Sequence, residues 1–91
     1  MSPPRRKPRH CKCKFKGKAF KPTGIPMTEI AQIAISRDEL EVLKLCDLDG
    51  LTQAEAGERM GVSRGTIQRT LAEARKKVAS ALSKGQALVF Q

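Results

Sequence analysis

Apolar residues recur at helical spacing along the second half of the chain. Steps of three or four residues separate Ile67, Leu71, Ala74, Val78 and Leu82. This spacing places them on one face of a helix, and that face should pack inward. Ser63 is suited to cap the first turn and Gly85 to follow the last, so a helix is predicted from about residue 64 to about residue 83.

Two shorter helices are predicted ahead of this one by capping boxes, in which a Ser or Thr and a Glu three residues later bond each other's backbone amides. Ser36-Arg37-Asp38-Glu39 predicts a helix over residues 37–48, and Thr52-Gln53-Ala54-Glu55 predicts a helix that ends near residue 60. The side chains expected to face the core are Leu40, Leu43, Leu45 and Cys46 in the first helix and Ala56, Gly57 and Met60 in the second.

Two short apolar segments lie outside these helices. Ile30, Ile33 and Ile35 fit a strand about as well as a helical turn, and we interpret them as extended. Residues 87–90 also have the composition of a strand. The pattern leaves open whether the two segments form a short terminal strand pair, within one chain or between two chains.

The tripeptide Gly61-Val62-Ser63 separates the second and third predicted helices. Gly61 can adopt a positive φ, and Val62 is expected to be buried beneath the bend. Two helices joined by a short glycine-containing turn are typical of a helix-turn-helix, in which the second helix enters the major groove of DNA. The fold expected for residues 27–91 is therefore mainly α, a three-helix helix-turn-helix domain. The alternative is a plain corner of two helices with a solvated outer face.

The face of the third predicted helix opposite its apolar stripe carries small, amide and guanidinium groups. Arg64 and Arg69 can each donate two hydrogen bonds to guanine, and Gln68 can pair with adenine in the same way. Gly65 would let the backbone come close to DNA. These residue types suit a DNA groove better than a protein core.

Groups suited to phosphate lie at helix ends, on the third predicted helix and in the N-terminal segment. Thr52 and Gln53 begin the second helix, where unpaired amides and the helix dipole attract anions. The candidate phosphate contacts are Thr52, Gln53, Ser63 and Lys76 in the helical region and Arg5, Arg6, Lys7 and Arg9 near the N-terminus.

Charge is divided unevenly along the 91 residues, which carry a net charge of +9. Residues 1–21 hold nine bases and no acid, residues 22–58 carry a net charge of −6, and residues 59–91 carry +6. A polyanion is the expected partner, and the acidic middle should mostly face away from it. Residues 1–26, which combine bases with prolines, are expected to form a largely disordered, flexible basic arm and linker.

Length and hydropathy exclude several classes of protein. The longest apolar stretches are too short to span a membrane, and no apolar segment follows the basic N-terminus, so we expect a cytoplasmic protein with no membrane partner. A chain this short leaves little room for a substrate pocket beside its core. Its one His belongs to no legible nucleophile–base motif, so we do not expect an enzyme.

Four potential soft ligands raise the question of a metal site. His10, Cys11 and Cys13 fall within four residues, and Cys46 is a candidate fourth ligand for zinc. The Cys-x-Cys spacing differs from the usual pair and bases surround it, so neither a metal nor another cofactor is favoured. Zinc binding, or oxidant sensing by the thiols of the arm, remains the alternative. Cys46 on its own is expected to pack in the core.

One segment carries a more specific signal. Residues 51–67, LTQAEAGERMGVSRGTI, resemble the fourth region of bacterial sigma factors, which reads the upstream promoter element. This resemblance implies base-reading roles for Arg64, Gly65, Thr66, Gln68 and Arg69. Thr70 stands where the sigma motif is usually apolar, and Gly65 stands where it usually has an acid. Because of the difference at Gly65, the same promoter specificity is not implied.

Nearly the whole chain is similar to a family of small, uncharacterised prokaryotic proteins predicted to bind DNA. The matching segments are the basic start, Phe20-Lys21-Pro22-Thr23-Gly24-Ile25-Pro26, Asp38-Glu39-Leu40-Glu41, the helix-turn-helix and Gly85-Gln86-Ala87-Leu88. The resemblance implies a helix-turn-helix fold and DNA binding, and says little about biological role.

These patterns together predict sequence-specific binding to double-stranded DNA by a transcriptional regulator. One alternative is a basic accessory protein that binds RNA or the ribosome, although the scarcity of aromatic residues argues against stacking on single-stranded bases. Another is a DNA-binding switch that responds to metal or redox state. Homodimerisation and a contact with RNA polymerase are left open.

Overall fold

The computed structural model describes residues 19–91 of the chain. These residues are mainly helical and form three α-helices and one small sheet of three strands. In chain order the elements are β1 (Ala19–Phe20), the 3-10 helix η1 (Met27–Glu29), β2 (Gln32–Ile35), α1 (Arg37–Leu43), the π-helical turn η2 (Lys44–Leu48), α2 (Gln53–Met60), α3 (Arg64–Lys84) and β3 (Ala87–Phe90). The expectations for Arg5, Arg6, Lys7, Arg9, His10, Cys11 and Cys13 lie outside the described residues.

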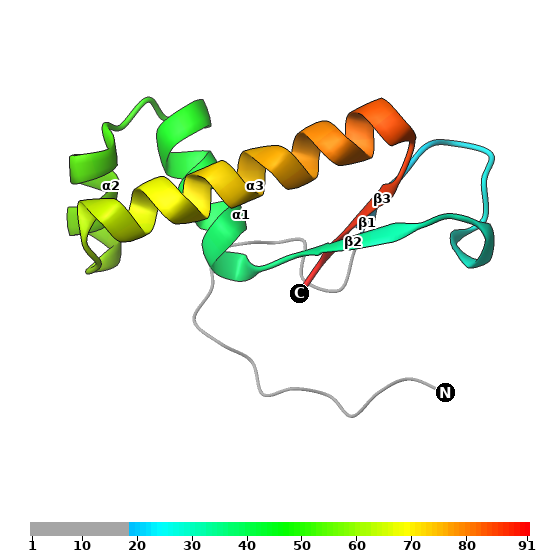
Figure 1. Cartoon of the computed structure of the whole chain (residues 1–91), viewed down its shortest axis with the longest axis horizontal. Helices are drawn as coiled ribbons and strands as arrows, with labels where there is room; N and C mark the ends of the chain where they lie inside the picture. Colours follow the sequence, from blue (N-terminus) through cyan, green and yellow to red (C-terminus); the bar gives the residue numbers. More distant parts are fainter. Residues whose placement is uncertain (1–18) are drawn as a thin grey trace.

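The long helix α3 connects the two parts of the structure. Its N-terminal half packs against α1 and α2, and its C-terminal half extends over the sheet (Figure 1). No helix in the described part of the chain is both long enough and apolar enough to cross a membrane.

The helix starts follow the capping residues of the sequence. Ser36 Oγ accepts a hydrogen bond from the Glu39 amide at 3.1 Å, and the Ser36 amide donates to Glu39 Oε1 at 2.9 Å. Thr52 and Glu55 make the same reciprocal pair at 3.1 and 2.8 Å. The predicted first helix extends to Leu48, but its last five residues form the π-helical turn η2.

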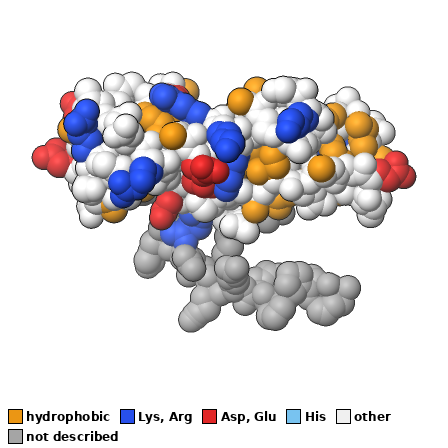
Figure 2. Space-filling view, viewed as in Figure 1, with side chains coloured by type: hydrophobic (Ala, Val, Ile, Leu, Met, Phe, Trp, Pro, Cys, Tyr) orange, Lys and Arg blue, Asp and Glu red, His pale blue; other side chains and the backbone are white. Residues whose placement is uncertain are grey.

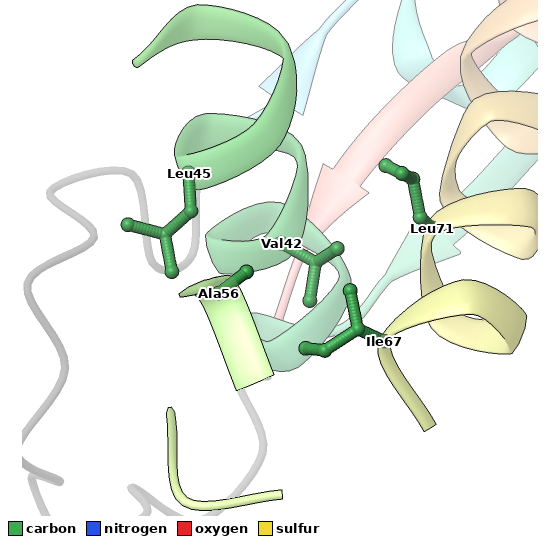
Figure 3. Close-up of a cluster of buried hydrophobic side chains, with 5 residues drawn as sticks. All are labelled: Val42, Leu45, Ala56, Ile67 and Leu71. Atoms are coloured by element: carbon green, nitrogen blue, oxygen red, sulfur yellow. The ribbon is translucent and has the colours of Figure 1, made fainter. Parts of the chain in front are cut away.

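The core forms where the three helices meet. Its central cluster consists of Val42 from α1, Leu45 from η2, Ala56 from α2, and Ile67 and Leu71 from α3 (Figure 3). Val42 is fully buried, although the sequence pattern had suggested Leu40, Leu43, Leu45 and Cys46 as the inward residues. Of those four only Leu45 is fully buried; the others are half-buried.

Two apolar residues expected inside are on the surface. Leu82 is 80% exposed, and Ala81 is buried in its place. By this point α3 has passed beyond α1 and α2 and packs on the sheet, which meets the helix from the side of Ala81. Val62 is 40% exposed because its backbone, rather than its side chain, faces α2 across the turn.

The two segments predicted to be extended pair within one chain. Strand β3 is central and lies parallel to β2, with Ile33 opposite Leu88 and Ile35 opposite Phe90. Its other edge pairs antiparallel with β1, whose residues Ala19 and Phe20 the sequence pattern had assigned to the arm. The Phe20 ring meets the Phe90 ring edge to face, with centroids 5.7 Å apart.

Candidate nucleic-acid interface

A tight turn joins α2 to α3. Gly61 ends α2 with φ of 75°, a left-handed conformation that favours glycine and that the sequence predicted at this position. The Val62 amide then donates to the Gly57 carbonyl at 2.9 Å. Ser63 caps α3, and its hydroxyl accepts from the Thr66 amide at 3.1 Å. Hydrogen bonds at both ends of the turn therefore set how α3 projects from α2.

Gly57 permits the close approach of α2 to this turn. A Cβ atom built at residue 57 would lie 2.7 Å from the Val62 carbonyl oxygen and 3.5 Å from Ile67 Cγ1. The first distance is shorter than folded proteins tolerate, so any side chain here would push the turn away from α2. The sequence had indicated a small inner residue at this position, and the structure places Gly57 at the closest contact.

The first two turns of α3 present polar side chains to solvent. Arg64, Gln68 and Arg69 are exposed, whereas Gly65 and Thr66 are half-buried. Figure 2 shows basic and acidic groups interspersed over the side of the molecule in view. The five candidate base-reading residues thus lie on the first two turns of one helix, and Ile67 is the buried core residue of the same segment.

Three of these candidates interact with one another and with the helix cap. Ser63 Oγ and Thr66 Oγ1 are 3.0 Å apart, and Arg69 Nη2 donates to Thr66 Oγ1 at 3.4 Å. Arg69 Nη1 lies 3.6 Å from the position that a Cβ on Gly65 would occupy. The Arg69 side chain thus folds back over Gly65, and Thr66 contacts Arg69 as well as the cap.

The N-terminus of α2 already holds one anion. The Glu55 carboxylate accepts from the Thr52 amide, and Thr52 Oγ1 accepts from the Glu55 amide. The amides of Gln53 and Ala54, which lie between them, have no acceptor within the helix. A phosphate at this end would therefore use the Gln53 amide and the Thr52 hydroxyl proton beside a carboxylate that is already bound.

Two ion pairs link α3 to η2 and α1. Arg75 donates to both carboxylate oxygens of Asp47, at 2.7 and 3.1 Å. The Arg75 hydrogen bond lowers the pKa of the Asp47 carboxyl below its ordinary value. Lys77 Nζ donates to Glu39 Oε1 and to the Ala34 carbonyl, each at 2.8 Å. Part of the acidic middle is therefore paired with bases of α3.

Glu39 combines two roles in this arrangement, because it also completes the cap of α1. Burial opposes its ionisation, but hydrogen bonds from Lys77 and from the Ser36 amide outweigh that effect and lower the pKa of Glu39. The sequence pattern identified the capping role and missed the ion pair. It also missed Arg75, although the spacing of eleven residues from Arg64, about three helical turns, could have placed Arg75 on the same side of α3.

Lys76 and Cys46 differ in their surroundings. Lys76, a candidate phosphate contact, is exposed on α3.

Cys46 is half-buried against the core cluster, and burial raises the pKa of its thiol. Among residues 19–91 no three His, Cys, Asp or Glu side chains are close enough to share a metal ion. The other candidate ligands, His10, Cys11 and Cys13, lie outside that range.

Comparison with known proteins identifies relatives in several prokaryotes. A UPF0251 protein of Vibrio parahaemolyticus is 51% identical over 71 residues, which cover 78% of this chain and 74% of the relative. One from Shewanella pealeana is 46% identical over 90 residues, covering 99% of this chain and 93% of the relative. One from Halothermothrix orenii is 50% identical over 72 residues, but these make up only 53% of its length.

No solved structure matches the chain. The family model described as "Protein of unknown function DUF134" matches residues 2–91. With nearly its whole length matched and relatives at about half identity, the chain belongs to the DUF134, or UPF0251, family of small prokaryotic proteins.

Proposed function

We propose that this chain binds double-stranded DNA in a sequence-specific manner through a helix-turn-helix formed by α2, the turn at Gly61 and α3, and that it acts as a transcriptional regulator. The observation that carries the proposal is the outer face of the first turns of α3. There Arg64, Gln68 and Arg69 are exposed together on a helix whose start is held by the Ser63 cap and the Gly57 contact.

In this proposal α3 lies in the major groove with its N-terminal turns toward the bases, and α2 crosses the DNA backbone. Arg64 and Arg69 donate to guanine, and Gln68 pairs with adenine. Arg69 must break its hydrogen bond with Thr66 to reach a base. This costs little, because the donor–acceptor distance of 3.4 Å indicates a weak hydrogen bond. Thr52, Gln53, Ser63 and Lys76 contact phosphates at the edges of the groove.

A plain corner of two helices would also bury Ile67 and expose polar side chains. It would not require a glycine at residue 57 in direct contact with the turn, nor exposed guanidinium and amide groups on successive turns of the second helix. Both features suit a helix that must project from the domain at a set angle and contact base edges. They support the DNA-binding proposal over the corner.

Selection of bound sequences from a random duplex pool, followed by affinity measurements on the selected site, tests the proposal. Arg69→Ala should weaken binding to that site by about 5- to 150-fold, the equivalent of ~1–3 kcal/mol, and should change binding to random DNA little. Lys84→Ala is the matched control, since Lys84 is also an exposed base of α3 but lies at its far end.

Two results would contradict the proposal. One is an equal loss of affinity for the selected site in the Arg69→Ala and Lys84→Ala variants. The other is failure of any duplex to bind more tightly than a structured RNA competitor, which would instead favour the RNA-binding alternative. A palindromic selected sequence would additionally indicate a two-fold dimer.

A further inference from the structure

Arg75 of α3 forms a bidentate ion pair with Asp47 of η2. Arg75 Nε donates to Asp47 Oδ2 at 3.1 Å, and Arg75 Nη2 donates to Asp47 Oδ1 at 2.7 Å. Both side chains remain accessible, with 57% of Arg75 and 39% of Asp47 exposed. Another anion can therefore reach the Arg75 guanidinium from solvent.

The position of Arg75 along α3 places it beside the proposed reading face. It follows Gln68 by two helical turns and Arg64 by about three, so the three side chains point within about 40° of one another around the helix. At a rise of ~1.5 Å per residue, Arg75 lies roughly 16 Å beyond Arg64. The major groove is about 12 Å wide. When Arg64 reaches base edges, Arg75 therefore comes to the phosphates at the groove wall.

A carboxylate and a phosphate offer the same two-oxygen partner to a guanidinium group. Asp47 thus occupies on Arg75 the place that a DNA phosphate would take. We propose that Asp47 is an internal counter-anion that competes with DNA phosphate for Arg75 and so weakens binding of this chain to duplex DNA of any sequence. The inference rests on the proposed function, because it assumes that α3 enters the major groove.

The other ion pairs among the described residues are either less exposed than the Arg75–Asp47 pair or do not involve α3. Lys77 and Glu39 are only 25% and 12% exposed, and their pair closes the cap of α1. Lys44 and Asp49 are as exposed as the Arg75 pair, at 52% and 36%, but neither belongs to α3. Asp49 therefore provides a matched control. Its neutralisation changes the net charge as much as neutralisation of Asp47 and releases a base that is not on the reading helix.

The experiment compares the full-length wild-type chain with Asp47→Asn, Asp49→Asn, Arg75→Ala and the Asp47→Asn/Arg75→Ala double variant. Binding to a fluorescent random-sequence duplex is measured by anisotropy over a range of salt concentrations. Thermal unfolding of each variant, followed by circular dichroism, shows that it is folded. Asp47→Ser is a second neutral substitution measured in the same way.

Asp47→Asn should bind up to about eightfold more tightly than wild type at 0.1 M salt, because one added phosphate contact steepens the slope of log affinity against log salt by about 0.9. The advantage should disappear near 1 M salt. The gain should be equal on random and selected DNA, and it should be absent when Arg75 is alanine. Asp49→Asn should leave the slope unchanged.

The inference is overturned if Asp47→Asn and Asp49→Asn raise the affinity for duplex DNA equally, since the change in net charge would then explain both gains. It is also overturned if the gain persists without Arg75. These failures are separate from failure of the proposed function, which is tested by Arg69→Ala on selected DNA. If the wild-type chain binds no duplex at any salt concentration, both ideas are wrong.

Discussion

Substitution of Gly57 by alanine tests the packing of α2 against the turn. The added methyl group would lie 2.7 Å from the Val62 carbonyl oxygen, which is backbone and cannot rotate away. The turn must therefore move from α2, and overpacking of this kind costs about 1–3 kcal/mol. Alanine also favours a helix over glycine by about 1 kcal/mol, which partly offsets that cost.

Gly65→Ala is the control that separates the two effects. Gly65 is also helical, and a Cβ there would meet Arg69 Nη1 at 3.6 Å and Ser63 Oγ at 3.9 Å, which are ordinary contacts. This variant should gain helix propensity without a clash. The free energy of unfolding of Gly57→Ala should therefore be lower than that of Gly65→Ala by about 1–3 kcal/mol.

Urea denaturation followed by circular dichroism measures both variants under identical conditions. A slope of unfolding free energy against urea that matches wild type would show that the native fold is retained. Equal stability of the two variants would refute the reasoning, because it would mean that the turn can move from α2 without cost. Nuclear magnetic resonance shifts confined to Gly61 and Val62 in the Gly57 variant would locate the displacement.

Two further predictions concern stability. Ile67→Ala should lower the free energy of unfolding by about 2–5 kcal/mol because Ile67 is fully buried, whereas Leu82→Ala should change it by less than about 0.5 kcal/mol because Leu82 is 80% exposed; a large loss for Leu82→Ala in urea denaturation would contradict the observed packing of α3. The lowered pKa of Glu39 means that its ionised form stabilises the fold, fully above the ordinary glutamate pKa and progressively less as pH falls through the lowered value. Urea midpoints measured across the acid range should thus fall more steeply in wild type than in Lys77→Gln, which lacks the ion pair, and parallel curves would show that this pair contributes nothing.

The parts of the fold that depend on neighbouring residues were predictable. Both capping boxes formed as expected because each joins residues only three apart. Gly61 and Gly85 end their helices in the left-handed conformation, a local preference of glycine. The candidate reading residues follow from the same logic, since helical spacing alone places Gln68 one turn after Arg64, with Arg69 next to it.

The burial of individual side chains was less predictable because it depends on where other elements pack. Spacing alone could not distinguish Leu82 from Ala81, since both lie at the edge of the apolar stripe. The sheet packs against the last turns of α3 on the side of Ala81, so Ala81 is buried and Leu82 is exposed. Strand β1 was also missed, because two residues carry almost no local signal and their partner β3 lies at the opposite end of the sequence.

By itself the sequence therefore determined where helices begin and end and which residues share a face, because those features rest on hydrogen bonds and spacings of a few residues. The tertiary structure decided which bases of α3 are paired with acids. Asp47 and Arg75 are 28 residues apart in the chain, and Glu39 and Lys77 are 38 apart. Each pair exists only because α1 and η2 pack across α3. No local sequence pattern encodes this contact between distant segments.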